Sequence, residues 1–104
     1  KRKGKLIRDL IPDIIRANDQ EPVVIVLDDN EYAMTLDDKF VEEAIEIRGA
    51  ATDEEKLEEL SDSDELTDAR LKALGKTRED LERVKREKAQ KRGAFVNKYY
   101  LISE

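Results

Sequence analysis

The chain of 104 residues contains no cysteine, histidine or tryptophan, and aromatic residues make up only 5% of it. Without cysteine it can form neither a disulfide framework nor a thiolate metal site. Without histidine, zinc sites and catalytic triads built on imidazole are also excluded. No apolar run approaches the length of a membrane span, and the basic start is not followed by a signal-type apolar core. We therefore expect a soluble, cytoplasmic protein that does not bind a membrane.

Charge is what the chain has in abundance. Charged residues reach 44%, and 26 acids against 20 bases give a net charge of −6. This acidic balance argues against general nucleic-acid binding, which needs a basic footprint. The length suits one domain, residues 1–104, with room for only a modest core. Because a lone monomer would bury little apolar surface, we expect a homodimer or homotetramer.

Two helical segments each carry a pair of acids three residues apart, Glu43 with Glu46 and Glu59 with Asp62. This spacing places each pair on one face of its helix. The segment 48–53 has the pattern of a helix end followed by a new N-cap, so an antiparallel hairpin would bring the pairs face to face. Four crowded carboxylates repel one another, and a bound cation relieves that repulsion. Oxygen ligands of this kind suit Mg²⁺, with Mn²⁺ as a possible substitute.

An ordinary solvated face is the alternative interpretation of these acids. Glutamate pairs at helical spacing are common on helix surfaces, where they pair with lysine or arginine one turn away. The chain would then be a purely structural helical oligomer. The apolar residues beside the acids, such as Val41 and Ile45, favour the metal site instead. Glu42 and Glu58 point about 100° away from the paired acids and are second choices as ligands.

The remaining segments predict a mainly α protein with a small β element. A stripe of apolar residues before and after Pro12 predicts an ordered arm and a short helix that begins near Ile11. The run 23–27 is rich in β-branched residues and predicts a strand, and 95–102 is its expected partner in a two-stranded ribbon. Capping and apolar patterns predict the other helices at 31–48, 52–75 and 77–92.

The acidic pairs also carry a resemblance. Glu43-x-x-Glu46, then the twelve residues 47–58, then Glu59-x-x-Asp62 resembles the signature of the MazG-like all-α nucleoside triphosphate pyrophosphohydrolases. Three further motifs resemble the small phosphoribosyl-ATP pyrophosphohydrolase-like proteins of that superfamily, so the resemblance covers nearly the whole chain. These motifs are Lys5-Leu6-Ile7-Arg8-Asp9-Leu10-Ile11-Pro12, Leu27-Asp28-Asp29-x-Glu31-Tyr32 and Glu87-Lys88-x-x-x-Arg92-Gly93-x-Phe95.

The resemblance implies an oligomeric helical bundle in which carboxylates hold Mg²⁺ against a substrate triphosphate. Members of the superfamily cleave between the α and β phosphates, releasing a nucleoside monophosphate and pyrophosphate in a house-cleaning role. Carried over residue by residue, the metal-binding and catalytic acids are Glu43, Glu46, Glu59 and Asp62. The basic residues that fall in or near the matched motifs are the candidates for phosphate contacts: Lys5, Arg8, Lys39, Lys88 and Arg92.

One segment departs from the family pattern. After Asp62, related sequences continue with an apolar helix, whereas residues 63–68 are mostly polar and include Asp64 and Asp68. Buried carboxylates without partners are costly, so these two acids must face solvent, pair with cations or join the metal site. This departure motivates a second hypothesis, a non-catalytic nucleotide- or metal-binding regulatory module with the same fold.

Overall fold

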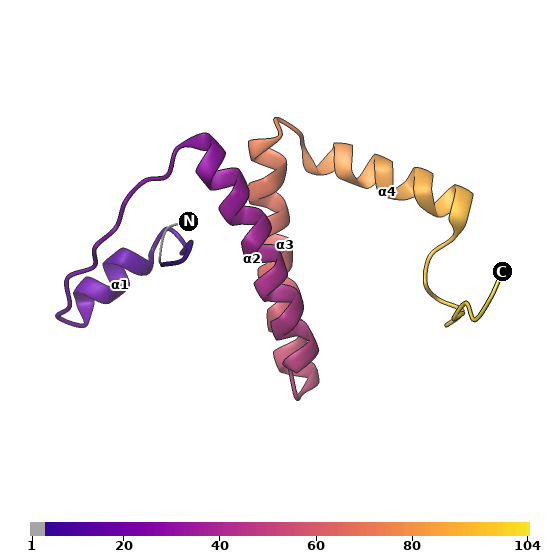
Figure 1. Cartoon of the computed structure of the whole chain (residues 1–104), viewed down its shortest axis with the longest axis horizontal. Coiled ribbons are helices and arrows are strands. Elements are labelled where there is room, and N and C mark those ends of the chain that lie inside the picture. The colour runs from indigo at the N-terminus through magenta and orange to yellow at the C-terminus, as the bar shows by residue number, and fades with distance from the viewer. Residues whose placement is uncertain (1–3) are drawn as a thin grey trace. The chain divides into compact units, whose positions relative to one another are not determined.

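The computed structural model describes residues 4–104, and this part of the chain forms four helices. They are α1 (Ile11–Ala17), α2 (Asp29–Gly49), α3 (Asp53–Ala73) and α4 (Arg78–Arg92), shown in Figure 1. The chain divides into two compact units, of which the first ends at Arg70 and the second runs Leu71–Glu104. The mainly helical fold and all four predicted helices are confirmed, while the single domain 1–104 stays a prediction.

Helix α1 begins where the proline pattern indicated. Pro12 lies in its first turn, where the missing backbone N–H of proline costs nothing. The Arg16 guanidinium bonds back to Asp13 at 3.3 Å, a pairing across one turn that is also favoured by the helix dipole. The helix ends after Ala17, where the side-chain amide of Asn18 donates to the Ile14 carbonyl at 3.2 Å.

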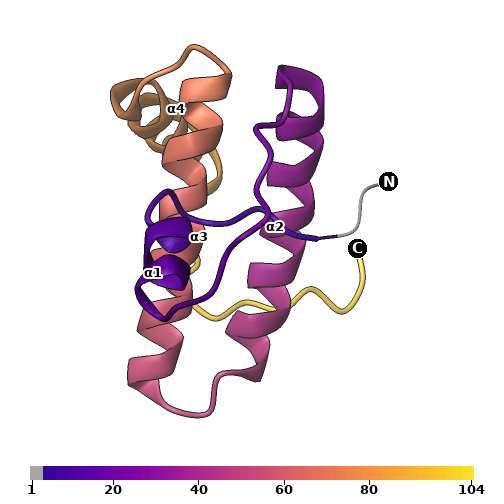
Figure 2. The same ribbon diagram turned by 90° about the vertical axis from the view of Figure 1, so that its left-hand side faces the viewer.

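Helices α2 and α3 form the antiparallel hairpin that the sequence predicted, and they lie side by side in Figure 2. The Asp28 carboxylate caps α2 by accepting from the Glu31 backbone N–H at 2.8 Å. The Thr52 hydroxyl caps α3 by accepting from the Glu55 backbone N–H at 3.1 Å. At the turn between them, the Lys56 ammonium donates to the Ile47 carbonyl, which satisfies one of the last carbonyls of α2.

One face of α2 supplies the small core of the first unit. Leu36, Phe40, Glu43 and Ile47 follow one another at three- and four-residue steps, so they share a face of the helix. Leu36 is 1% exposed and Glu43 is 5% exposed, while Phe40 and Ile47 are half-buried. The carboxylate of Glu43 therefore sits in an otherwise apolar stripe, and its burial follows from its place in the helical repeat.

The half-buried face of α3 is far more polar. Glu59, Ser63, Leu66 and Arg70 share this face by the same helical spacing, and all four are half-buried. Arg70 reaches across to α2 and pairs with Asp37 at 3.3 Å. Since this face offers one large apolar side chain against three polar ones, the hairpin buries little apolar surface.

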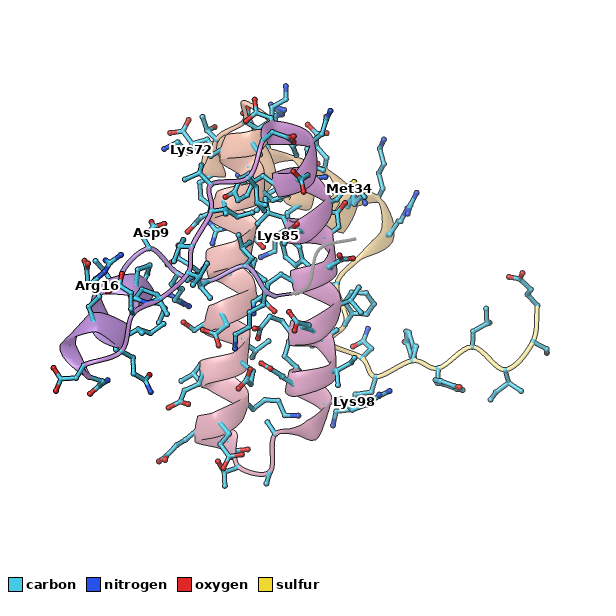
Figure 3. The ribbon with its side chains drawn as sticks, turned by 60° about the vertical axis from the view of Figure 1, so that its left-hand side comes forward. Asp9, Arg16, Met34, Lys72, Lys85 and Lys98 are labelled. Carbon is cyan, nitrogen blue, oxygen red and sulfur yellow. The ribbon has the colours of Figure 1, made fainter. Side chains whose placement is uncertain are left out.

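The opposite face of α2 is exposed and carries three apolar side chains around Asp38. Met34, Val41 and Ile45 lie about 200° around the helix from the Leu36 and Glu43 face. Their exposed fractions are 68%, 62% and 56%. Figure 3 shows Met34 on the side of α2 away from α3. Within the first unit this face has no covering element among the described residues.

The predicted β ribbon is not formed. From residue 4 to residue 104 there is no strand, and both 23–27 and 95–102 are irregular. Val23 and Val26 are each 97% exposed, and Phe95 and Tyr99 are also fully or almost fully exposed. The two segments belong to different compact units of the chain. β-Branched composition favours a strand only where a partner and a packed face are supplied, and the prediction had assumed both.

No helix in the described part of the chain is both long and apolar enough to cross a membrane.

Truncating Leu36 tests the core. The variant Leu36→Ala should lower the free energy of unfolding by about 2 to 4 kcal/mol, since a fully buried leucine loses its packing and leaves a cavity. Urea unfolding followed by circular dichroism measures this loss. The matched control is Leu57→Ala, because Leu57 is 69% exposed and the chemical change is identical. A loss for Leu36→Ala no larger than that for Leu57→Ala would contradict the assigned core.

Candidate metal centre

Three of the four predicted acids meet between α2 and α3. One carboxylate oxygen from each of Glu43, Glu46 and Glu59 lies within 4.8 Å of the other two. Helix α2 supplies the first two acids one turn apart, and α3 supplies the third from its half-buried face. The antiparallel hairpin thus brings together the acids that the spacing in the sequence had placed on facing sides.

Burial separates this cluster from an ordinary acidic surface. Glu43 is only 5% exposed. Its Oε2 atom and the Oε2 atom of Glu59 are buried and have no hydrogen-bond partner among the described residues. A buried carboxylate oxygen without a donor is costly, because the solvation it gave up is not replaced. A cation placed among these oxygens would replace that solvation.

The crowding raises the pKa of two of the three carboxyls. Hydrogen bonding to Glu46, together with burial and the nearby Glu43, raises the pKa of Glu59 from 4.5 to about 7. Burial and the negative charge of Glu46 raise the pKa of Glu43. Neighbouring carboxyls can hydrogen-bond only when one of them carries a proton. In the absence of a cation, a shared proton therefore relieves the repulsion within the cluster.

The spacing of these oxygens fits a small divalent ion. Around an octahedral Mg²⁺, opposite oxygens are about 4.2 Å apart and adjacent oxygens about 3.0 Å apart, since each Mg–O distance is about 2.1 Å. Of three oxygens that share one ion, at most one pair can be opposite, so the other pairs, now within 4.8 Å, would come to about 3.0 Å when the ion binds. Glu46 is exposed, whereas Glu43 is buried. The donor set consists of oxygens only, which suits Mg²⁺ or Mn²⁺.

The fourth predicted acid is engaged elsewhere. Asp62 accepts from Arg8 Nη2 at 2.6 Å, and Arg8 Nη1 lies 3.8 Å from a carboxylate oxygen of Glu65. Arg8 belongs to the arm that precedes α1. The predicted cage of four carboxylates is therefore a cluster of three within the described residues, and Asp62 is the exception. The physical reason is a competing cation from the chain itself.

The sequence did not predict the ion pair between Arg8 and Asp62. Arg8 was predicted to contact a substrate phosphate, and nothing in the spacing indicated a partner 54 residues away. The sequence offered one signal, which was that Arg8 lies among apolar residues of the arm and so needs an acidic partner where the arm packs.

The other candidates are divided between the two units. Lys39 pairs with Glu42 at 3.4 Å along α2, on the side of the helix to which the 100° step per residue turns Glu42. Glu58 is exposed, as is Lys5 in the arm before α1. Lys88 and Arg92 are exposed on α4 in the second unit. The phosphate contacts assigned to the five basic residues stay predictions.

Metal-free protein should become less stable as the pH rises from about 5 to 7. In the folded state Glu59 keeps its proton up to about pH 7, whereas in the unfolded chain it loses the proton near its ordinary value of 4.5. Unfolding therefore releases a proton in this window, and a higher pH favours unfolding. Thermal unfolding in EDTA at a series of pH values measures the effect as a melting temperature that falls across the window and then levels.

Two variants make this measurement specific. Glu59→Gln should flatten the pH dependence, since the amide neither titrates nor repels its neighbours. Glu58→Gln changes the exposed adjacent residue in the same way and should leave the dependence as it is. An unchanged slope in Glu59→Gln would mean that the crowding of this cluster does not control the pH dependence.

Comparisons with known proteins give one partial relative. A stretch of 55 residues is 46% identical to an uncharacterized protein of Mycolicibacterium smegmatis. The match spans 53% of this chain and 56% of that protein, so the chain covers little more than half of the relative's length. No protein-family model and no solved structure matches the chain. The resemblance to MazG-like proteins therefore stays a prediction based on motifs.

Proposed function

We propose that this protein is a Mg²⁺-dependent nucleotide pyrophosphohydrolase of the MazG-like type. It would cleave a nucleoside triphosphate, or a related nucleotide, between the α and β phosphates to give a monophosphate and pyrophosphate, in a house-cleaning role. The proposal combines the motif resemblance with the geometry of the carboxylate cluster. The small phosphoribosyl-ATP pyrophosphohydrolase-like proteins are the part of the superfamily that the chain resembles.

The buried carboxylate of Glu43 is the observation that carries this proposal. A solvated acidic face would have left Glu43 in water, yet its side chain is 95% removed from solvent beside two further acids. Retaining such an arrangement is costly unless a proton neutralises the charge or a cation compensates it. A divalent ion that binds carboxylates and keeps open positions for phosphate oxygens is the arrangement used in phosphoryl and nucleotidyl chemistry.

The three acids would have different roles in the active site. When bound, Mg²⁺ supplies charge that neutralises phosphate oxygens and lowers the pKa of a coordinated water. Glu43, fixed by packing, and Glu46, which is exposed, would hold the ion from one helix. Glu59, which faces these two acids from the half-buried side of α3, is suited to orient the attacking water and accept its proton.

A homo-oligomer is the second part of the proposal. The exposed stripe of Met34, Val41 and Ile45 runs along α2 opposite the carboxylate cluster, and the apolar segments 23–26 and 95–102 are also exposed. A second copy of the chain that covers the stripe would supply the burial that the hairpin lacks. We also propose that the predicted ribbon of 23–27 with 95–102 is part of this assembly.

Sedimentation velocity should reveal a species larger than the 12.0 kDa chain. Charging the stripe in Val41→Glu should shift the protein toward the monomer, because an acid in an apolar interface loses its solvation. Glu42→Gln, a change at the next position, should leave the assembly intact. Wild-type protein that sediments only as a monomer at tens of micromolar would contradict this part of the proposal.

A non-catalytic module is favoured by one observation. Arg8 occupies Asp62, so three carboxylates rather than four are collected between α2 and α3 in the described residues. A cluster of three could bind a metal-nucleotide complex without turning it over. Binding of Mg²⁺ and nucleotide with no product from any substrate would support this alternative over the enzyme.

Hydrolysis is tested directly by incubating the purified protein with Mg²⁺ and a panel of ribo- and deoxyribonucleoside triphosphates. Anion-exchange chromatography should resolve a monophosphate and pyrophosphate. Glu43→Gln should lower kcat by about 100-fold or more, since several kcal/mol of charge stabilisation depend on the ion it helps to hold. EDTA should abolish the activity.

Glu42→Gln is the matched control. Glu42 is the adjacent residue, it is exposed, and it pairs with Lys39 rather than with the cluster. It should retain most of the wild-type kcat. Release of orthophosphate instead of pyrophosphate, or equal activity in Glu43→Gln and wild type, would refute the assigned reaction or site.

A further inference from the structure

We infer that Arg8 is a positioning residue that holds Asp62 away from the carboxylate cluster and releases it when the site is filled. The inference rests on the proposed function in one respect, namely that the cluster binds a divalent cation. In addition to any contact with phosphate, Arg8 in the arm before α1 would then control whether three or four carboxylates can bind the metal.

The geometry places Asp62 within reach of the cluster. It follows Glu59 by three residues on α3, so the two side chains lie on neighbouring sides of the helix and about 4.5 Å apart along its axis. What turns Asp62 aside is the short contact of its Oδ1 atom with Arg8 Nη2 at 2.6 Å. The second nitrogen of the guanidinium, Nη1, is 3.8 Å from Glu65 Oε1, so the fork spans two acids of α3 that lie three residues apart.

This ion pair can be exchanged. The Arg8 side chain is 57% exposed and Asp62 is 40% exposed, so water and ions reach both partners. An exposed pair of this kind shifts an equilibrium by a factor of about five or less. A buried pair would have locked Asp62 in place, whereas this exposed pair is weak enough for a divalent cation to displace.

Two states of the site follow from this competition. With Arg8 on Asp62, the cluster offers Glu43, Glu46 and Glu59. With Arg8 displaced, Asp62 becomes a fourth ligand. A phosphate-bearing ligand favours the second state, because a guanidinium binds two phosphate oxygens at once and so gives up the carboxylate. By linkage, phosphate binding and metal binding then strengthen each other by the same factor.

A double-mutant cycle on metal affinity tests this inference without relying on turnover. Isothermal titration with Mn²⁺ would be carried out on the wild-type chain, Arg8→Gln, Asp62→Asn and the double variant. Arg8→Gln should bind Mn²⁺ about three- to fivefold more tightly than wild type, because Asp62 is set free. In the Asp62→Asn background the same arginine change should have no effect.

Arg16→Gln is the charge-matched control. Arg16 lies on α1 (Figure 3) and pairs with Asp13 and Glu21, so its removal takes away the same charge without freeing Asp62. It should leave Mn²⁺ affinity at the wild-type value. Circular dichroism of each variant confirms that the helices are retained, and Arg8→Lys should fall between wild type and Arg8→Gln.

The outcomes separate this inference from the proposed metal site. Equal tightening by Arg8→Gln in both backgrounds would show a general charge effect and overturn the inference, as would no tightening in either. In both cases, Mn²⁺ binding that is lost in Glu43→Gln would leave the metal site standing. No saturable Mn²⁺ binding by wild type would overturn the metal site and the inference together.

Discussion

The burial of one carboxylate organises the first unit of this protein. Glu43 occupies a position on α2 that the helical repeat assigns to the core, between Leu36 and Ile47. Moving a charge from water to such a place is unfavourable by several kcal/mol unless the charge is neutralised or compensated. Without a metal, the raised pKa values of Glu43 and Glu59 mean that a retained proton neutralises part of this charge. In the proposed function, a divalent cation would compensate the charge instead.

The same constraint accounts for the thin core. The polar half-buried face of α3 brings Glu59 to the site, and it therefore cannot bring large apolar side chains to the hairpin interface. Besides the Leu36 core, the hairpin is joined by the Lys56 contact at the turn and by the Arg70–Asp37 pair. Exposed ion pairs contribute little each, so a structure of this kind gains much from metal binding or from association with a second copy. Stability and function would then depend on the same carboxylates.

Arg8 links the hairpin to the arm before α1. Its contact with Asp62 connects the N-terminal arm to α3 and engages the one motif acid outside the cluster among the described residues. A site with one exchangeable carboxylate responds to its ligand, whereas a fixed cage of four would not. The competing hypotheses of enzyme and binding module differ in whether that exchange takes place.

Local patterns in the sequence determined the helices and their ends. Pro12, Asp28, Thr52 and Thr77 lie at or next to helix starts, because capping and proline effects involve only residues a few positions apart. The spacing of Glu43, Glu46 and Glu59 was sufficient to predict that they share a site, since a hairpin of two helices leaves few alternatives. Tertiary structure alone decided the placement of Asp62, because an arginine 54 residues away competes for it. It also leaves 23–27 irregular in the described chain, since β pairing requires a partner that no local pattern specifies.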